Sequence, residues 1–213
     1  KLTYEEMLEM SSTGAKVLQT RSVELAMKNN LTLQVLSSFT NQQGTYVVNE
    51  NELIENEIVS GVSYSKNESK ITISGIPDKP GISALVFGLM ASNNINVDMI
   101  VQNISQDGIN ANITFTVPNN ELEECKKIIE GKYNELNYSN LSTDSDIAKI
   151  SVVGMGMMSQ SGVAEKMFTT LAKNKINIQA ISTSEIKISV LIKKIYTDLA
   201  IKSLHDVYKL DKK

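Results

Sequence analysis

Residues 70–103 read KITISGIPDKPGISALVFGLMASNNINVDMIVQN, and residues 149–184 read KISVVGMGMMSQSGVAEKMFTTLAKNKINIQAISTS. The two stretches are copies of one pattern, about 80 residues apart. Each copy runs from a short apolar strand through a glycine-bearing loop into a helix, and then into a second strand. Backbone amides at a helix N-terminus have no partner within the helix and can bind an anion. The duplication therefore predicts two backbone-lined pockets, or one pocket shared between the copies.

The composition excludes several classes of protein. A net charge of −3 provides no basic surface for the phosphates of a nucleic acid, and an aromatic content of 5% leaves few side chains for nucleobases to stack on. Nucleic acid is therefore not expected as a partner. We find no apolar run of membrane-spanning length and no signal-peptide pattern, so a membrane partner is not expected either. The single cysteine, Cys125, precludes an internal disulfide. These features predict a globular protein of the cytoplasm.

The first 48 residues form a block of their own. Thr3 and Glu6 have the spacing of a capping box, and Gly14 is expected to end the first helix. Two further helical pieces are predicted within residues 17–26, followed by a strand over 31–36 and an edge strand over 45–48. We interpret residues 1–48 as the last helix-to-strand part of an α/β domain, because they are too few to cover both faces of a parallel sheet.

From residue 57 onward, short strands alternate with helices. The first copy predicts the order βαββαβ, and the second copy lacks one strand. The expected elements are strands 71–74, 96–104, 110–117 and 135–141 with helices 81–93 and 121–132, and then strands 150–153, 177–182 and 186–192 with helices 162–174 and 196–207. We expect Glu57–Ser65 to be the missing strand, with Ile58, Val62 and Tyr64 on one face. The predicted fold class is α+β, with one domain over residues 66–145 and a second, discontinuous domain made of 57–65 and 146–213.

The first loop, residues 75–81, has the composition of a small-molecule site. Gly81 allows the backbone to approach a ligand where the next helix begins, and free amides there suit a carboxylate. Asp78 in the same loop suits an ammonium group, so the loop offers both parts of the recognition of a free amino acid. The alternative is that Asp78 only caps the helix or forms an Asx turn.

The second loop, residues 154–162, has lost the aspartate and gained hydroxyl and amide groups. Its Gly154-x-Gly156 invites comparison with a dinucleotide fingerprint. We reject that fingerprint because Ser159 occupies the third glycine position and the strand over 177–182 has no acidic residue for a ribose.

Other candidate residues point to packing. His205, the only histidine, has no neighbouring ligand cluster, so a solvated or capping role is favoured over a metal or general-base role. Cys125 lies among aliphatic residues at helical spacing and is interpreted as a small buried side chain, and Met157 and Met158 are also expected to pack. No catalytic triad, Walker loop or metal site is predicted in this chain.

Several motifs together resemble a known family. Five motifs resemble the end of the amino-acid kinase domain of aspartokinases: EMLEM at residues 6–10, GAKVL at 14–18, Arg21, VLSSF at 35–39 and Gly44-Thr45. Six further motifs resemble the paired ACT domains of the same enzymes: GIPDKPG at 75–81, NINVDMIVQN at 94–103, Ile113–Phe115, KISVVGMG at 149–156, STSEIKISV at 182–190 and Ser203–His205. The resemblance implies two ferredoxin-like ACT domains with four-stranded antiparallel sheets, preceded by the C-terminal remnant of an α/β kinase domain.

The resemblance also implies a function and a set of site residues. It implies a regulatory segment that binds lysine, threonine or both where ACT domains meet, and that inhibits ATP-dependent phosphorylation of L-aspartate, the first step toward lysine, threonine and methionine. Implied partners are a second copy, through the ACT domains, and the kinase domain of the same enzyme. In the first module the implied effector residues are Asp78, Lys79, Pro80, Gly81, Ile82, Asn96, Val97, Asp98, Gln102 and Thr114. In the second module they are Met157, Ser159, Gly162, Val163, Asn177, Ile178, Thr183, Ser184 and Glu185.

The sequence departs from the family pattern in two places. Gln19-Thr20 stands where the family usually has His-Pro, and the lysine- and glycine-rich motif that contacts ATP in the family is not found in these residues. No catalytic residue, cofactor or metal is therefore expected here, while ATP and magnesium are expected for the full-length enzyme. We interpret the chain as a fragment in preference to a natural regulatory subunit. The alternative function is an ACT dimerisation module that binds no ligand.

Overall fold

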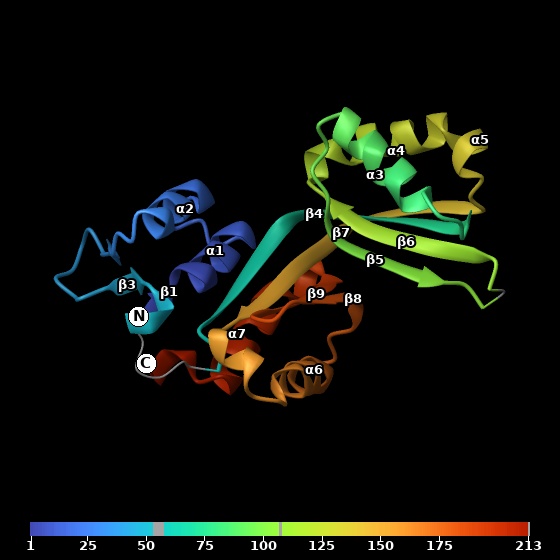
Figure 1. Cartoon of the computed structure of the whole chain (residues 1–213). Coiled ribbons are helices and arrows are strands. Elements are labelled where there is room, and N and C mark those ends of the chain that lie inside the picture. The colour runs from blue at the N-terminus through green and yellow to red at the C-terminus, as the bar shows by residue number, and fades with distance from the viewer. Residues whose placement is uncertain (53–57, 107, 213) are drawn as a thin grey trace. The chain divides into compact units, whose positions relative to one another are not determined.

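The computed structural model describes residues 1–52, 58–106 and 108–212 (Figure 1). The chain separates into two compact units, residues 66–148 and residues 1–65 with 149–213. Two long strands, β4 (Gly61–Pro77) and β7 (Asn140–Val153), each supply residues to both units. Each unit is described separately below.

The unit of residues 66–148 is a sheet covered by helices on one face (Figure 1). Its strand order is β5 (Asp98–Ile104), β6 (Asn110–Val117), β4, β7, and β6 is antiparallel to both of its neighbours. The helices are α3 (Ile82–Ser92), α4 (Leu122–Gly131) and the short α5 (Tyr133–Leu136). Alternate residues of β6, such as Ile113 and Phe115, are fully buried in the core with Val86 and Met90 of α3. The order of elements is βαββαβ, as predicted.

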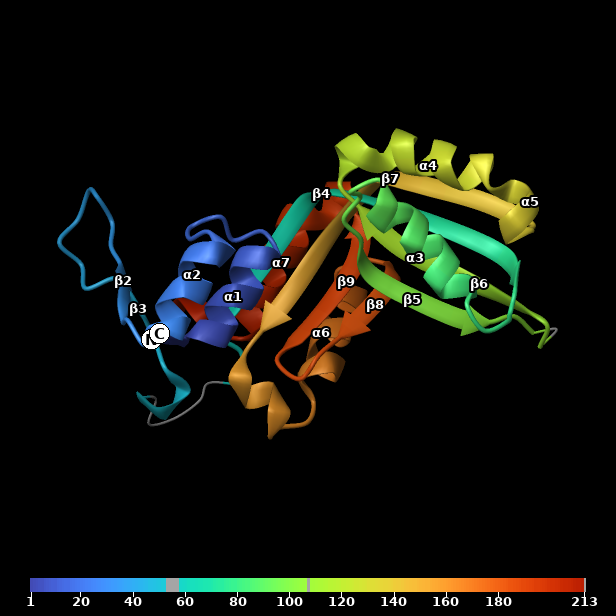
Figure 2. The ribbon, with the colours of Figure 1, turned by 45° about the horizontal axis from the view of Figure 1, so that its top comes forward.

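In the other unit, the first residues of β4 and the last residues of β7 join β9 (Lys187–Lys193) and β8 (Ile178–Thr183), in the order β4, β7, β9, β8. Strands β8 and β9 are antiparallel. Helices α6 (Val163–Lys173) and α7 (Thr197–Val207) lie on one side of these strands (Figure 2). Met167 and Leu171 of α6 and Leu204 of α7 are buried against β7 and β9. The predicted α+β class with two ferredoxin-like sheets is confirmed.

The N-terminal residues of the same unit form a smaller layer with its own core. Helices α1 (Tyr4–Ser12) and α2 (Thr20–Lys28) accompany a sheet in the order β1 (Leu2–Thr3), β3 (Thr45–Val48), β2 (Leu33–Val35). The capping box is confirmed, since Glu6 N–H donates to Thr3 Oγ1 over 3.1 Å and Thr3 N–H donates to Glu6 Oε2 over 2.9 Å. Short 3₁₀ turns lie at Glu50–Glu52, Asn119–Glu121, Met155–Met158, Lys194–Tyr196 and Leu210–Lys212.

Several predicted elements are wrong, mostly where a strand pairs with a distant partner. The strand expected over residues 135–141 is instead α5 followed by the start of β7. Residues 61–65 and 71–74, which were expected to lie in two separate strands, belong to one continuous strand, β4. Strand 45–48 is central, not an edge, because β1 and β2 pair on its two sides. A single helix, α2, replaces the two helical pieces expected within residues 17–26.

The expected face of the strand at 57–65 is also wrong in part. Val62 packs against the core with α6 and α7, whereas Ile58 and Tyr64 are exposed and Val59 is buried. Strand β4 begins only at Gly61, so Ile58 and Val59 do not follow the alternation of a strand. Residues 53–57, which include Glu57 of the expected strand, lie outside the described residues. Across the described ranges, no helix is both long and apolar enough to cross a membrane.

Candidate functional site

The two glycine loops enter their helices with the same backbone conformation. Gly81 before α3 has φ 94° and ψ −11°, and Gly162 before α6 has φ 96° and ψ −6°. Both lie in the left-handed region that favours glycine, and a Cβ added to either would have no atom within 4 Å. Among the described residues, no side chain caps either helix. Each copy therefore presents an open helix N-terminus of the kind that binds anions.

The first loop is exposed and is anchored by the backbone. Asp78, Lys79 and Pro80 are exposed, and Asp78 N–H donates to the carbonyl of Ile109 over 2.9 Å. Ile82 is only 3% exposed, and its N–H donates to the carbonyl of Lys79 over 3.2 Å. Ile82 thus shapes the loop from the core side. The amides that follow it in α3 are the ones left to face a ligand.

Strand β5 brings a second group of expected residues to the start of α3. Gln102 is exposed, and its Oε1 accepts a hydrogen bond of 2.6 Å from the hydroxyl of Ser83 in the first turn of α3. Asp98 Oδ1 accepts the N–H of Met99 over 2.7 Å, at a bulge where Met99 has φ 45°. The structure therefore places Gln102 beside the first turn of α3. The carboxylate of Asp98 bonds to the backbone at the bulge in β5.

The remaining expected residues of the first module have different environments. Asn96 is exposed in the turn after α3, and Val97 packs against the core. Thr114 lies on β6 between the core residues Ile113 and Phe115, and its hydroxyl is 3.0 Å from that of Thr72 on β4. Since alternate residues of a strand face opposite sides, Thr114 is on the face of the sheet away from the helices.

The second loop is more enclosed than the first. Met157 packs against the core, Val163 is buried, and Ser159 is exposed with its hydroxyl donating to the Gly156 carbonyl over 3.3 Å. The hydroxyl of Tyr208 donates to the carbonyl of Val163 over 2.8 Å, and the ammonium of Lys166 lies 5.2 Å from the centre of the Tyr208 ring. Burial, followed by the charge of Glu165, raises the pKa of Tyr208. The sequence analysis did not identify Tyr208, which has no local motif.

The polar residues at the end of β8 are explained in part by a turn. Thr183, Ser184 and Glu185 are exposed, and Ser184 N–H donates to the carbonyl of Lys187 over 2.8 Å, closing the hairpin between β8 and β9. Asn177 is exposed after α6, while Ile178 packs against the core. Turn formation is thus a sufficient reason for this polar cluster, and a ligand is not needed to account for it.

The other side chains considered from sequence are largely structural. Cys125 is fully buried beside Met90, and burial together with the charge of Glu121 raises the pKa of its thiol to about 12. The packing role predicted for Cys125 is confirmed, as it is for Met157, whereas Met158 is exposed. His205 is partly exposed in the last turn of α7. Across the described ranges, no group of three histidine, cysteine or acidic residues could hold a metal ion.

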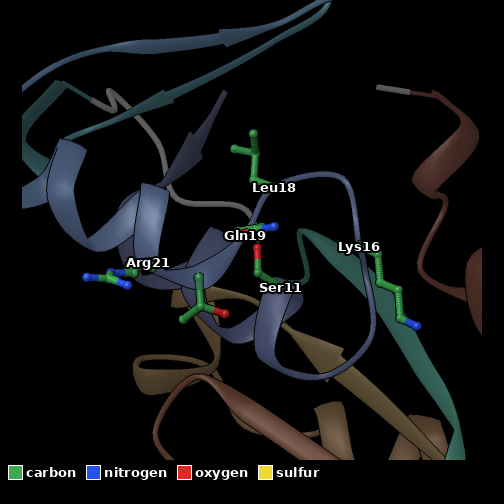
Figure 3. A pocket seen from close by; sticks show the side chains of 6 residues that line it. Ser11, Lys16, Leu18, Gln19 and Arg21 are labelled. Carbon is green, nitrogen blue, oxygen red and sulfur yellow. The ribbon is translucent and has the colours of Figure 1, made fainter.

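A pocket between α1 and α2 was not predicted from the sequence. It has a volume of about 500 Å³ and is lined by Ser11, Lys16, Leu18, Gln19, Thr20 and Arg21. Figure 3 shows Lys16 and Arg21 on opposite sides of the pocket, with their charged ends directed apart. The nearest sequence signal was the departure at Gln19-Thr20, which fell in this lining. The pocket offers hydroxyl and amide groups but no converging pair of cations.

Comparison with known proteins identifies the fold of the two modules. A family model of the ACT domain matches residues 70–133 and 150–208, which together are more than half of the chain. Both matched segments contain one of the open glycine loops and the strand that follows its helix. The chain therefore carries a tandem pair of ACT domains.

Similar proteins define the family more narrowly. The aspartate kinase of Pseudomonas putida is 48% identical over 212 residues, which are 99% of this chain and 51% of that protein. The solved structure of aspartokinase alpha and beta subunits is 41% identical with a TM-score of 0.67, covering 71% of this chain and 99% of that chain. The ligand-free regulatory subunit of aspartate kinase from Thermus thermophilus is 36% identical with a TM-score of 0.66, covering 70% and 98%.

The chain belongs to the aspartokinase family. It spans about half the length of the curated relatives that it matches.

Proposed function

We propose that this chain is the regulatory part of an aspartokinase. It binds lysine, threonine or both at its ACT domains and thereby inhibits the ATP-dependent phosphorylation of L-aspartate. The observation that carries the proposal is the pair of matching open helix N-termini at Gly81 and Gly162, in a chain of the aspartokinase family. Free amides at these positions suit the carboxylate that all amino acids share.

The first loop supplies the more complete recognition site. Its exposed Asp78 carries the charge that an α-ammonium or lysine ε-ammonium group needs, and the start of α3 supplies the donors for a carboxylate. Gln102, held by Ser83, adds an amide at the edge of the same site. We therefore propose that the first loop binds the effector more tightly than the second, whose loop is without an acidic residue.

The proposed partners follow from the same comparisons. The chain resembles proteins described as the regulatory subunit of an aspartate kinase and as aspartokinase alpha and beta subunits. We propose that it acts on the kinase domain of the same enzyme in the cytoplasm, and that ATP and magnesium bind in that enzyme's catalytic part. The effector residues named from the resemblance remain part of this proposal.

Titration calorimetry with lysine, threonine and methionine tests the proposal, with Asp78→Ala as the first variant. Loss of one charged hydrogen bond should weaken binding by about 1.5–3 kcal/mol, or roughly 10- to 150-fold. Asp146→Ala is the matched control, because it removes the same charge from an exposed position on β7. Binding of none of the amino acids would contradict the proposed function, and equal loss in both variants would remove Asp78 from the site.

A second candidate function is dimerisation through the ACT sheets without a ligand. Its support is the apolar surface of the outer strands, where Ile100 and Ile104 of β5 and Ile181 of β8 are exposed. Unpaired outer strands of this kind favour pairing with another chain. Sedimentation with and without lysine and threonine separates the two functions, because a purely structural dimer would show the same association in both conditions.

A further inference from the structure

Glu6 is a buried carboxylate that contacts three separate parts of the chain. It lies in the first turn of α1 and is 2% exposed. Its Oε2 accepts Thr3 N–H over 2.9 Å in the capping box. Its Oε1 accepts the hydroxyl of Ser60 and, over 2.9 Å, the N–H of Met155, which is 149 positions away in the sequence. Only the contact with Thr3 was expected from the capping-box pattern.

Met155 is the second residue of the second glycine loop, and its surroundings are tightly fixed. The preceding residue, Gly154, donates its N–H to the carbonyl of Ile186 over 3.0 Å. A Cβ on Gly154 would lie 2.3 Å from the carbonyl oxygen of Ile58, so the two backbones are in direct contact. The entry to the loop is therefore held from three directions, by Glu6, by Ile58 and by Ile186. A change of loop conformation at this end must break or move one of these contacts.

The burial of Glu6 makes its contacts interdependent. A buried carboxylate is tolerated only when its oxygens are hydrogen-bonded, and removing one partner leaves an unsatisfied charge. Displacement of the Met155 amide therefore disfavours the present position of the Glu6 side chain. The same side chain also accepts the N–H of Thr3, which is the N-cap residue of α1. Movement of the loop and order of α1 are linked through one carboxylate.

We propose that Glu6 is a positioning residue that couples the loop of residues 154–162 to helix α1. A ligand that rearranges this loop changes the order of α1, and by linkage a change in the order of α1 alters ligand affinity at the loop by the same coupling free energy. The inference rests on the proposed function only in its ligand-dependent part. It adds to that function a route by which the second ACT domain reaches the N-terminal layer of the chain.

The two oxygens of Glu6 allow the coupling to be separated from helix capping. Thr3→Ala removes the side-chain cap on Glu6 N–H but leaves the Glu6 Oε1 contact with Met155. Glu6→Gln keeps one oxygen that can accept the Met155 N–H while losing the carboxylate. Glu6→Ala removes every contact. A merely structural role in α1 predicts that all three variants loosen α1 and that none acts selectively on the loop.

Amide hydrogen exchange on the full 213-residue chain without ligand is the first test. Glu6→Ala should speed exchange of the amides from Met155 to Gln160 by about tenfold or more, with Glu6→Gln nearer to wild type and Thr3→Ala unchanged in the loop. An Ala variant whose loop exchanges within about twofold of wild type overturns the proposal. Should Glu6→Ala fail to fold, the exchange rate of the Met155 amide in the wild-type chain is the test. If that amide exchanges as fast as in an unstructured chain, Glu6 does not hold it and the proposal is overturned.

Exchange with lysine or threonine is the second test. In wild type, ligand should alter exchange both in the loop of residues 154–162 and in α1, whereas in Glu6→Ala only the loop should respond. A wild-type response in the loop without one in α1 overturns the coupling, as does a response confined to residues 66–148. If calorimetry and exchange show no ligand binding at all, the proposed function fails, and the ligand-free comparison still decides the role of Glu6.

Discussion

At the scale of the residue, several glycines owe their identity to distant backbone. Gly14 was expected only to end a helix, yet its φ is 120° and an added Cβ would lie 1.9 Å from the carbonyl oxygen of Tyr64. Gly154 was weighed as part of a dinucleotide fingerprint, yet it is required where the backbone of Ile58 passes. The backbone that each glycine contacts, at Tyr64 or at Ile58, is remote in the sequence. A local pattern therefore identifies the glycine but does not show why a glycine is needed there. Thr3 and Glu6 were correctly paired because their interaction spans one helical turn.

Substitution of Gly154 by alanine should destabilise the chain. The added methyl group must displace the backbone of Ile58 and Val59, and such overpacking costs about 1–3 kcal/mol. Gly88→Ala is the control, since this helical glycine has open space around it and alanine there should stabilise by about 0.4–1 kcal/mol. Urea unfolding midpoints measure both changes. A Gly154 variant as stable as wild type would show that this contact is easily relaxed.

At the scale of the element, helices were predicted closely and long strands were not. The bounds of α3 and α6 differ from the expected ranges by one residue at each end, and those of α7 by one residue at its start. Apolar periodicity and flanking glycine and asparagine mark these helices locally. Strand β4 continues through Tyr64–Lys70, and β7 begins with the largely polar run Asn140–Asp146. Both runs have a turn-like composition. Pairing with a strand far away in the sequence supplies the hydrogen bonds that keep them extended.

The outer strand β5 should govern association between copies. Ile104, which is 60% exposed on β5, is expected to pack against another chain, and Ile104→Lys should weaken self-association by placing a charge on that edge. Ile195→Lys is the control, because Ile195 is also exposed, at 80%, but lies in the 3₁₀ turn before α7. Analytical ultracentrifugation over a concentration series measures the effect. Equal association constants for both variants would assign the contact to another surface.

At the scale of the whole molecule, the chain order does not follow the order of the compact units. Residues 66–148 form one unit between the two parts of the other. The sequence predicted an inserted domain from a strand that the second copy lacked, with bounds of 66–145 and 57–65 plus 146–213. The N-terminal layer lies in the same compact unit as residues 149–213. Contacts such as Glu6 with Met155 and the 2.8 Å ion pair of Glu9 with Lys187 join it there.

This division predicts which fragments fold. Residues 66–148 contain a complete core around Ile73, Ile113 and Phe115, so that fragment should unfold cooperatively and keep near-native circular dichroism. Residues 149–213 alone lack Val59 and Val62, which contribute to the other core, and should not fold. Proton NMR dispersion distinguishes the two states. A folded 149–213 fragment would show that the β4 residues are dispensable to this unit.

The α+β class, the helices α3, α4, α6 and α7 and the two glycine loops were determined by the sequence alone, because each rests on a pattern within about 35 residues. The repeat was also determined by the sequence, because two such segments about 80 residues apart resemble each other. Gly81 and Gly162 were both singled out from the sequence, whereas their left-handed backbone conformations, with φ of 94° and 96°, were seen only in the structure. Only the tertiary structure decided the lengths of β4 and β7, the burial of Ile82, the contact of Tyr208 with Val163 and the three contacts of Glu6. These depend on pairings between segments that no short-range pattern specifies, and their energy arises only when the chain has folded.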